Sequence, residues 1–238
     1  HASAVAAALK TEHYFREVTA DDLEHLRRIV GEFEEPFADS SMLPTSLLCQ
    51  FARQQVTVAL SGDGADELFG GYYRTRVIHL ARHLDLLPGP VRRGLHGVGR
   101  RLLPADSDER GMAGRLRRLL ALLPDSGLGR YERVISRASL SWRKRLYGPK
   151  LAPFLAQSQP LGEWANHYDG PAHLPVNALM ELELRSYLVD DILVKVDRAS
   201  MAHSLEVRSP YLDREVVQFA LTLPYEFKQQ GTHRKRIL

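Results

Sequence analysis

Residues 56–71 read Val-Thr-Val-Ala-Leu-Ser-Gly-Asp-Gly-Ala-Asp-Glu-Leu-Phe-Gly-Gly, and this stretch decides how the rest of the chain is interpreted. Its first part, 56–60, is apolar and rich in β-branched residues, which predicts a short strand buried on both faces. The Ser-Gly-Asp-Gly sequence at 61–64 predicts a tight loop, since glycine permits positive φ and close approach of a ligand. Residues 65–69 then predict a helix. This order directs backbone N–H groups at one point beyond the carboxyl end of the strand.

Three acidic residues lie in this loop and the helix that follows it: Asp63, Asp66 and Glu67. A site for a bare anion would exclude acids. Carboxylates beside phosphate-binding amides are explained if a divalent cation lies between them, because such cations bind carboxylate and phosphate oxygens together. The stretch is therefore interpreted either as a Mg-nucleotide or pyrophosphate site, or as a Gly-rich turn whose acids favour a helix N-terminus. The pattern alone leaves both open.

Length, charge, cysteine content and hydropathy bear on the class of protein and on its partners. The chain has 238 residues and a net charge of +3, so its basic pI of about 9.0 does not by itself indicate a polyanionic partner. Its single cysteine, Cys49, cannot form an internal disulfide, which fits a reducing compartment, and simple burial is its expected state. No apolar run approaches the roughly 18 residues that a membrane span needs. The chain starts at His1 without Met, and we expect a fragment of a longer protein.

The first part of the chain suggests alternating strands and helices, the pattern of a parallel sheet. A strand is predicted at 13–18. Thr19 is expected to cap a helix that carries Leu23, Leu26 and Val30 on one face. Another helix is predicted from Pro44 to about Gln54. After Gly71 no strong strand signal returns, and the predicted helices span 72–84, 91–103, 112–123, 131–137, 140–147, 176–189, 192–202 (capped by Asp191) and 214–223 (capped by Asp213). We therefore expect a partial α/β nucleotide-binding core at 1–75 and a mainly helical remainder of the same domain at 76–238.

Residues 91–118 hold eight arginines against three acids. This density indicates either a surface for nucleic acid or an acidic partner, or solvated helix faces. The solvated interpretation is favoured. No aromatic residues interleave with the arginines for base stacking, which weakens the case for single-stranded nucleic acid. The arginines are Arg92, Arg93, Arg100, Arg101, Arg110, Arg115, Arg117 and Arg118, and the acids are Asp106, Asp108 and Glu109.

Residues 61–72 closely resemble the second nucleotide-site motif in the synthetase domain of glutamine-hydrolysing (class B) asparagine synthetases. Other segments resemble that family in the same order, so the resemblance runs nearly end to end and is weakest over the Arg-rich middle. They are 35–41 (Glu-Pro-Phe-Ala-Asp-Ser-Ser), 43–45 (Leu-Pro-Thr), 190–202 (Asp-Asp-Ile-Leu-Val-Lys-Val-Asp-Arg-Ala-Ser-Met-Ala), 204–213 (Ser-Leu-Glu-Val-Arg-Ser-Pro-Tyr-Leu-Asp) and 231–238, which resembles the start of the family's lysine segment.

The resemblance implies an α/β ATP-pyrophosphatase fold, related to the adenine-nucleotide alpha-hydrolases, truncated here at its N-terminal strand. It implies a ligase that activates the side-chain carboxylate of aspartate as an acyl-adenylate, releases pyrophosphate, and lets glutamine-derived ammonia attack to give asparagine. ATP and Mg²⁺ are the implied cofactors. The implied partners are small-molecule substrates and the glutaminase domain of the same full-length chain, with no nucleic acid or membrane, a cytoplasmic location and a homodimer as one possible assembly.

The resemblance also implies roles for single residues. Asp66 would bind Mg²⁺ and through it pyrophosphate. Asp63 lies where the family places an acid that helps to form the adenylate and can accept a proton from ammonia; many members have the longer Glu there. Lys235 matches the lysine that neutralises the phosphates, so Asp63 and Lys235 are the expected catalytic residues. The residues expected to bind ATP are Ser61, Gly62, Gly64 and Asp66.

Several charged residues in the 190–208 region lie in otherwise apolar segments. They are interpreted as a buried, paired network that fixes the helices, with direct substrate binding as the alternative. His203 beside them is expected to be a hydrogen-bonded core histidine and not a metal ligand. The charged residues are Asp190, Asp191, Lys195, Asp197, Arg198, Glu206 and Arg208.

Two parts of the family pattern are absent from the sequence: a glutaminase domain and a Ser-Gly-Gly-x-Asp-Ser phosphate loop. We therefore expect the chain to bind ATP weakly or not at all and not to turn over alone. Two other functions stay open at this point. One is a related amidotransferase that acts on a different carboxylate, and the other is a non-catalytic helical module that binds polyanions through its Arg-rich helices.

Overall fold

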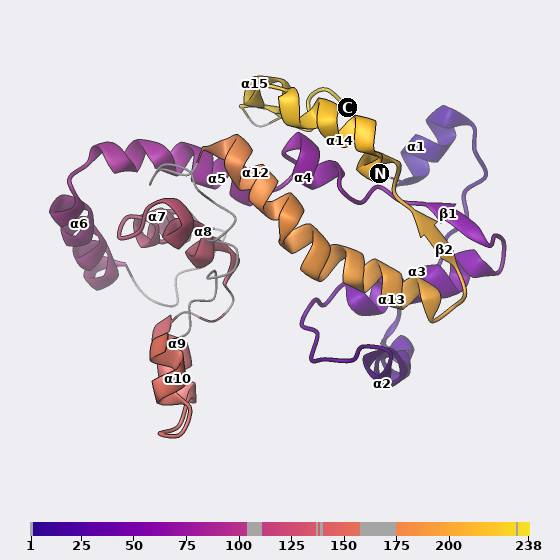
Figure 1. Cartoon of the computed structure of the whole chain (residues 1–238), viewed down its shortest axis with the longest axis horizontal. Helices are drawn as coiled ribbons and strands as arrows, with labels where there is room; N and C mark the ends of the chain where they lie inside the picture. Colours follow the sequence, from indigo (N-terminus) through magenta and orange to yellow (C-terminus); the bar gives the residue numbers. More distant parts are fainter. Residues whose placement is uncertain (1, 104–110, 137, 139, 158–174, 232) are drawn as a thin grey trace. The chain divides into compact units, whose positions relative to one another are not determined.

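The computed structural model describes residues 2–103, 111–136, 138, 140–157, 175–231 and 233–238 (Figure 1). The chain packs as two compact units. Unit 1 comprises residues 1–63 and 188–213, and unit 2 comprises residues 64–187 and 214–238. The predicted division of the synthetase domain near residue 75 stays a prediction.

Unit 1 is built from short helices around a two-stranded sheet (Figure 1). Its elements are α1 (Ala2–Leu9), η1 (Ala20–Asp22), α2 (Leu23–Gly31), α3 (Met42–Arg53), β1 (Val58–Leu60), η3 (Leu188–Leu193, a π-helix), α13 (Val194–Met201), β2 (Glu206–Arg208) and η4 (Pro210–Leu212).

The sheet of unit 1 is parallel, as the sequence predicted. β1 pairs with β2 in the register Val58 to Glu206, Ala59 to Val207 and Leu60 to Arg208. The Ser61 N–H extends the ladder by donating to the Arg208 carbonyl at 2.8 Å. β2 has no strand signal in the sequence, because Glu206 and Arg208 at its ends are charged and it contains no apolar run.

Two predictions about strands are wrong. Residues 13–18 have no strand structure, since no ladder partner satisfies their backbone groups within the described part of the chain. β1 is a strand but is not buried on both faces: Leu60 is 73% exposed and Val58 is 41% exposed. Val58 and Leu60 point to the same face of β1, which is open in the described part of the chain, whereas Ala59 on the opposite face is half-buried.

The core of unit 1 lies where α2, α3 and α13 meet. Ile29, Phe33 and Met42 form its buried cluster, and Val194 packs against it from α13. Cys49 on α3 is 5% exposed, which confirms its predicted burial, and that burial raises the pKa of its thiol. The predicted apolar face of α2 (Leu23, Leu26 and Val30) is exposed instead, because α2 turns Ile29 to the core.

Lys195 confirms part of the predicted charged network. Its ammonium, almost fully buried, donates to Asp39 Oδ2 at 2.5 Å and to Ser41 Oγ at 2.8 Å. Burial alone would raise the pKa of Asp39, but the hydrogen bonds from Lys195 and Ser41 hold it below its usual value. The pairs Arg198–Glu34 and Arg208–Glu206 lie nearer the surface, so these two parts of the predicted network are not buried. Asp191 does not cap a helix, because it lies inside the π-helix η3.

Unit 2 is almost entirely helical (Figure 1). Its elements are α4 (Ala65–Phe69), α5 (Tyr73–Ala81), η2 (Arg82–Leu86), α6 (Gly89–Leu102), α7 (Met112–Ala121), α8 (Gly127–Ile135), α9 (Leu140–Leu146), α10 (Ala152–Gln157), α12 (Val176–Arg185), α14 (Arg214–Thr222), α15 (Tyr225–Lys228), β3 (Gln229–Gln230) and β4 (His233–Arg234). Its core cluster is formed by Ile78, Tyr131, Leu179 and Leu182, from α5, α8 and α12. No helix in the described ranges is long and apolar enough to span a membrane.

Arginine side chains in unit 2 are used to hold its helices together. Arg130 on α8 is 2% exposed, and it pairs with Asp85 at 2.7 Å and donates to the Ala81 carbonyl at 3.0 Å. Arg92 of the Arg-rich segment also pairs with Asp85, at 2.8 Å. These contacts favour a structural role at least for Arg92. Four of the charged residues in the segment lie outside the described residues: Asp106, Asp108, Glu109 and Arg110.

A buried hydroxyl in unit 1 lies between two histidines. Ser46 Oγ is 2.9 Å from His25 Nε2 and 3.0 Å from His203 Nε2, and the two rings stack with centroids 5.6 Å apart. His203 is therefore hydrogen-bonded, as predicted. Burial is the main cause that lowers the pKa of both histidines. The charges of Arg28 and Arg16 lower the pKa of His25 further, and Asp22 raises it in part. The pKa of His203 is lowered further by His25 and Arg28 and raised in part by Glu32.

We expect the free energy of unfolding to fall as the pH drops below about 6.5, the unperturbed pKa of histidine. A histidine whose pKa is depressed by folding binds fewer protons in the native than in the unfolded state, so its contribution is present above that pH and is lost below it. Each histidine can add up to about 1.4 kcal/mol per pH unit to the slope. Denaturant unfolding from pH 8 to 5 should give a flatter profile for His25→Gln/His203→Gln than for a His233→Gln control. Equal slopes would contradict this account.

Candidate active site

The loop after β1 ends unit 1 at Asp63, and unit 2 begins at Gly64. In unit 1, Ser61 Oγ lies 2.7 Å from Ser209 Oγ, because β1 and β2 end side by side. Gly62 is exposed, and apart from its chain neighbours no residue has a heavy atom within 4 Å of the position that a Cβ would take there. Asp63 is half-buried, and its charge adds to burial in raising the pKa of Cys49. Ser209 was not singled out from the sequence, because its place depends on the unpredicted strand β2.

In unit 2, glycines bracket the short helix α4, which confirms the predicted helix at 65–69. Gly64 precedes it with φ of +86°, and Gly70 follows it with φ of +67°. Both values lie in the left-handed region that glycine adopts without a steric cost. The Gly71 N–H then donates to the Asp66 carbonyl at 2.9 Å. The Gly-rich sequence is thus needed to start and end a five-residue helix.

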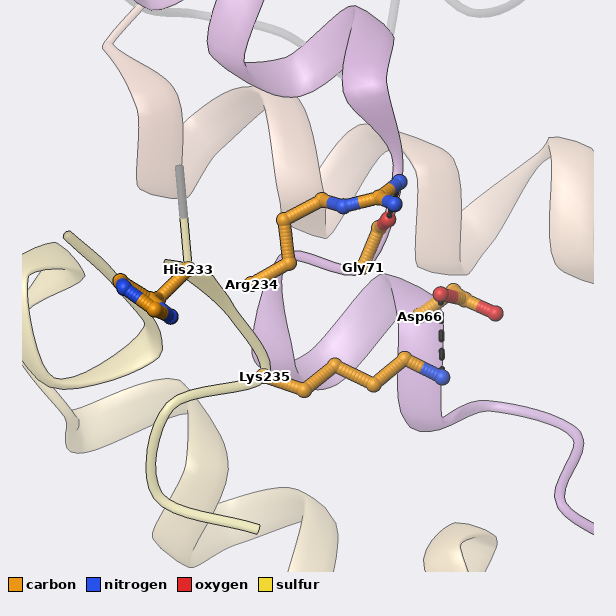
Figure 2. A pocket seen from close by; sticks show the side chains of 5 residues that line it. All are labelled: Asp66, Gly71, His233, Arg234 and Lys235. Carbon is orange, nitrogen blue, oxygen red and sulfur yellow. Dashed lines mark hydrogen bonds and ion pairs between the residues drawn. The ribbon is translucent and has the colours of Figure 1, made fainter. Parts of the chain in front are cut away.

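The neighbouring acids on α4 differ in environment. Glu67 is 2% exposed and accepts a hydrogen bond from the Tyr72 hydroxyl at 2.5 Å. Burial raises the pKa of Glu67, so this side chain belongs to the interior of unit 2. The Asp66 side chain is 38% exposed and points toward Lys235 (Figure 2). Of the two acids, Asp66 is therefore the one available to a ligand.

Asp66 and Lys235 form an ion pair in the lining of a pocket in unit 2. Lys235 Nζ lies 3.0 Å from Asp66 Oδ1, and both side chains remain about one-third exposed, at 35% and 38%. The pocket has a volume of about 480 Å³ and is lined by Asp66, Gly71, His233, Arg234 and Lys235 (Figure 2). The structure thus brings together two residues that the sequence analysis placed in one site from distant segments.

Lys235 has a left-handed backbone, with φ of +50°. Non-glycine residues in this region carry strain and are found disproportionately at functional sites. Beside it, Arg234 Nη1 donates to the Gly71 carbonyl at 2.8 Å, while His233 points away from the Asp66–Lys235 pair (Figure 2). Arg234 and Gly71 were not predicted as site residues. Their positions next to Lys235 and within the Gly-rich stretch were the available signals.

The chemistry of this pocket fits a phosphate group with a metal ion. Arg234 and Lys235 supply cationic groups, and Asp66 already has a cation as its neighbour. Mg²⁺ is commonly held by one or two carboxylates together with substrate phosphates, so a single carboxylate is compatible with such a site. Within the described ranges, no group of three or more His, Cys, Asp or Glu residues could hold a metal ion.

The contact between Asp66 and Lys235 needs a residue without a side chain at position 71. A Cβ atom at Gly71 would overlap Asp66 Oδ1 and Lys235 Cε and would lie 2.6 Å from Asp66 Cγ. We expect Gly71→Ala to displace the pair and to lower the free energy of unfolding by up to about 1 kcal/mol, the scale of an exposed ion pair, because the atoms that must move are the ends of partly exposed side chains. Gly62→Ala is the matched control, because its Cβ would meet open space. Chemical denaturation of the two variants measures the difference, and equal losses would contradict the steric argument.

The chain resembles known proteins over its whole length. Residues 1–238 match the family described as Asparagine synthase. A Mycobacterium bovis protein named putative asparagine synthetase (glutamine-hydrolyzing) is 35% identical over 246 residues, covering 100% of this chain and 35% of the relative. The Bacillus subtilis protein named asparagine synthetase (glutamine-hydrolyzing) 1 is 30% identical over 244 residues, covering 100% of this chain and 36% of the relative.

A Methanocaldococcus jannaschii protein named putative asparagine synthetase (glutamine-hydrolyzing) 2 is 39% identical over 101 residues, covering 37% of this chain and 19% of the relative. No solved structure gives a significant match. The chain spans about a third of the length of the first two relatives. The family match over residues 1–238 and the full-length similarity to these two proteins show that the chain belongs to the asparagine synthase family.

Proposed function

We propose that this chain is part of the synthetase region of an enzyme that converts aspartate to asparagine at the expense of ATP. The observation that carries the proposal is the contact between Asp66 and Lys235 at 3.0 Å on one pocket. A carboxylate suited to a divalent cation and an ammonium suited to phosphate meet there, and both groups come from segments that resemble the family. The relatives' names, which specify glutamine hydrolysis, support glutamine as the source of ammonia.

The proposed reaction has two steps. First, an oxygen of the aspartate side-chain carboxylate attacks the α-phosphorus of ATP, an acyl-adenylate forms and pyrophosphate leaves. Next, the ammonia nitrogen attacks the acyl carbon, the C–O bond to AMP breaks, and a base removes the proton from nitrogen. Both steps develop negative charge on phosphate oxygens, so fixed cations nearby stabilise their transition states.

Each site residue has a proposed role in these steps. Lys235 neutralises the phosphates as pyrophosphate or AMP departs, and Asp66 holds Mg²⁺, which supplies further neutralisation of the phosphates when bound. Asp63 accepts the proton from ammonia, directly or through water. Ser61, Gly62 and Gly64 contact the nucleotide from the loop. The exposure of Gly62 and the open space around it support this role for Gly62, whereas Gly64 is buried.

The proposal includes the fold of the whole domain. β1 and β2 belong to the parallel sheet of an ATP-pyrophosphatase fold, and the loop at 61–64 follows the carboxyl end of β1, where ligands of parallel sheets bind. The parallel pairing and the strand–loop–helix order support this assignment.

Aspartate-dependent release of pyrophosphate from ATP, measured in the natural gene product with glutamine or ammonium present, tests the function. We expect Asp66→Asn and Lys235→Ala each to lower kcat by about 100-fold or more, the scale seen when one stabilising group is removed from a transition state. Lys150→Ala is the control, because Lys150 is an exposed lysine that does not line the pocket.

Two outcomes would count against the proposal in different ways. Activity retained in both pocket variants would contradict the proposed catalytic roles of Asp66 and Lys235. Pyrophosphate release driven by another carboxylate, but not by aspartate, would contradict the proposed substrate while leaving carboxylate activation in place.

A further inference from the structure

The two groups on which the proposed function depends are bound to each other. Lys235 Nζ lies 3.0 Å from Asp66 Oδ1, so the ammonium occupies a position beside the carboxylate where a metal ion would bind (Figure 2). A divalent cation that coordinates this oxygen must displace the ammonium. A phosphate that pairs with the ammonium must likewise draw it away from the carboxylate.

We propose that Lys235 acts as an internal counter-ion for Asp66, so that metal and polyphosphate each favour binding of the other by breaking the same ion pair. The pair has to be broken only once. The first ligand to arrive therefore bears the cost of separating the pair, and the second finds its own partner free, which is a coupling free energy between two ligands. This inference rests on the proposed function, because it concerns the same metal and the same phosphates.

The contact is built into the local backbone. The Lys235 side chain passes close to Gly71, where a Cβ would overlap both members of the pair. Arg234 fastens the adjoining strand β4 to the Gly71 carbonyl at 2.8 Å, and Lys235 itself has a left-handed φ of +50°. Three features thus direct the ammonium to Asp66, whereas a chance meeting of two surface side chains would need none of them.

The exposure of the pair sets the size of the effect. Both side chains are about one-third exposed, at 35% and 38%, so water competes for them and the pair is weak. A pair of this kind changes an equilibrium constant by up to about fivefold. The ion pair is therefore strong enough to weaken metal binding severalfold in the absence of phosphate, and weak enough to separate when phosphate arrives.

The first test is binding of Mn²⁺ alone, followed by the electron paramagnetic resonance signal of the free ion at low salt. Mn²⁺ takes the same oxygen ligands as Mg²⁺. We expect Lys235→Gln to bind Mn²⁺ about two- to fivefold more tightly than the unaltered protein, because Asp66 is freed. Arg236→Gln is the control: it removes one positive charge from the residue next to Lys235, and Arg236 donates to the Glu226 carbonyl and not to Asp66, so we expect it to tighten Mn²⁺ binding less. The difference should shrink as salt screens the pair.

The second test is binding of pyrophosphate in the presence of a chelator, measured by calorimetry. We expect Asp66→Asn to bind metal-free pyrophosphate about two- to fivefold more tightly than the unaltered protein, because Lys235 is freed. Glu226→Gln, which neutralises an exposed acid elsewhere in unit 2, is the control and should change the affinity less.

The outcomes separate this inference from the proposed function. If Mn²⁺ binds but Lys235→Gln tightens it no more than Arg236→Gln does, the counter-ion role is overturned while the site stands. If Mn²⁺ does not bind even with pyrophosphate at millimolar concentrations, both the metal site and the counter-ion role fail. Tightening in both tests, each beyond its control, supports the inference.

Discussion

The parallel pairing of β1 with β2 is the constraint on which unit 1 depends. Two strands of three residues each, from distant segments of the chain, are held in a single register. The carboxyl ends of parallel strands share one edge, so the loop after β1 emerges next to the residues after β2. This is why Ser61 meets Ser209, 148 positions away in sequence, at 2.7 Å. Short-range patterning can place the loop after a strand, but the neighbour of that loop is chosen by the pairing.

The helices could be predicted from the sequence because their signals are local. α4 agrees with its prediction at both ends, since Gly64 and Gly70 fix where the helix starts and stops. Strands depend on partners, and the errors are found there. Residues 13–18 resemble a strand in composition but have no ladder, whereas Glu206–Arg208 has two charged residues and becomes a strand through pairing with β1. Propensity for strand structure mainly reports how a residue fits its neighbours in the sheet.

The candidate site was predictable to the extent that its residues lie in recognisable segments. Asp66 and Lys235 were identified through resemblance, and the fold brings them together. Arg234 and Gly71 were missed for a physical reason: one acts through a backbone carbonyl, and the other acts through the absence of a Cβ. Neither property appears in a pattern of charges. Glu67 shows the opposite case, because its charge suggested a ligand and the structure buries it against Tyr72.

The charged pairs of this chain fall into two physical kinds, and the difference explains which of them can bind ligands. Lys195–Asp39 is mostly buried, with exposures of 9% and 18%, and Arg130–Asp85 shields its arginine to 2%. Removing one partner from a buried pair costs about 3–5 kcal/mol, because a desolvated charge is left behind. Such pairs cannot exchange a partner for a ligand at a moderate concentration. Asp66–Lys235 is worth at most about 1 kcal/mol at its exposure, so it adds little to the stability of unit 2 and can separate readily. The weakness of this contact is therefore what would allow its two groups to exchange each other for ligands at the proposed binding site.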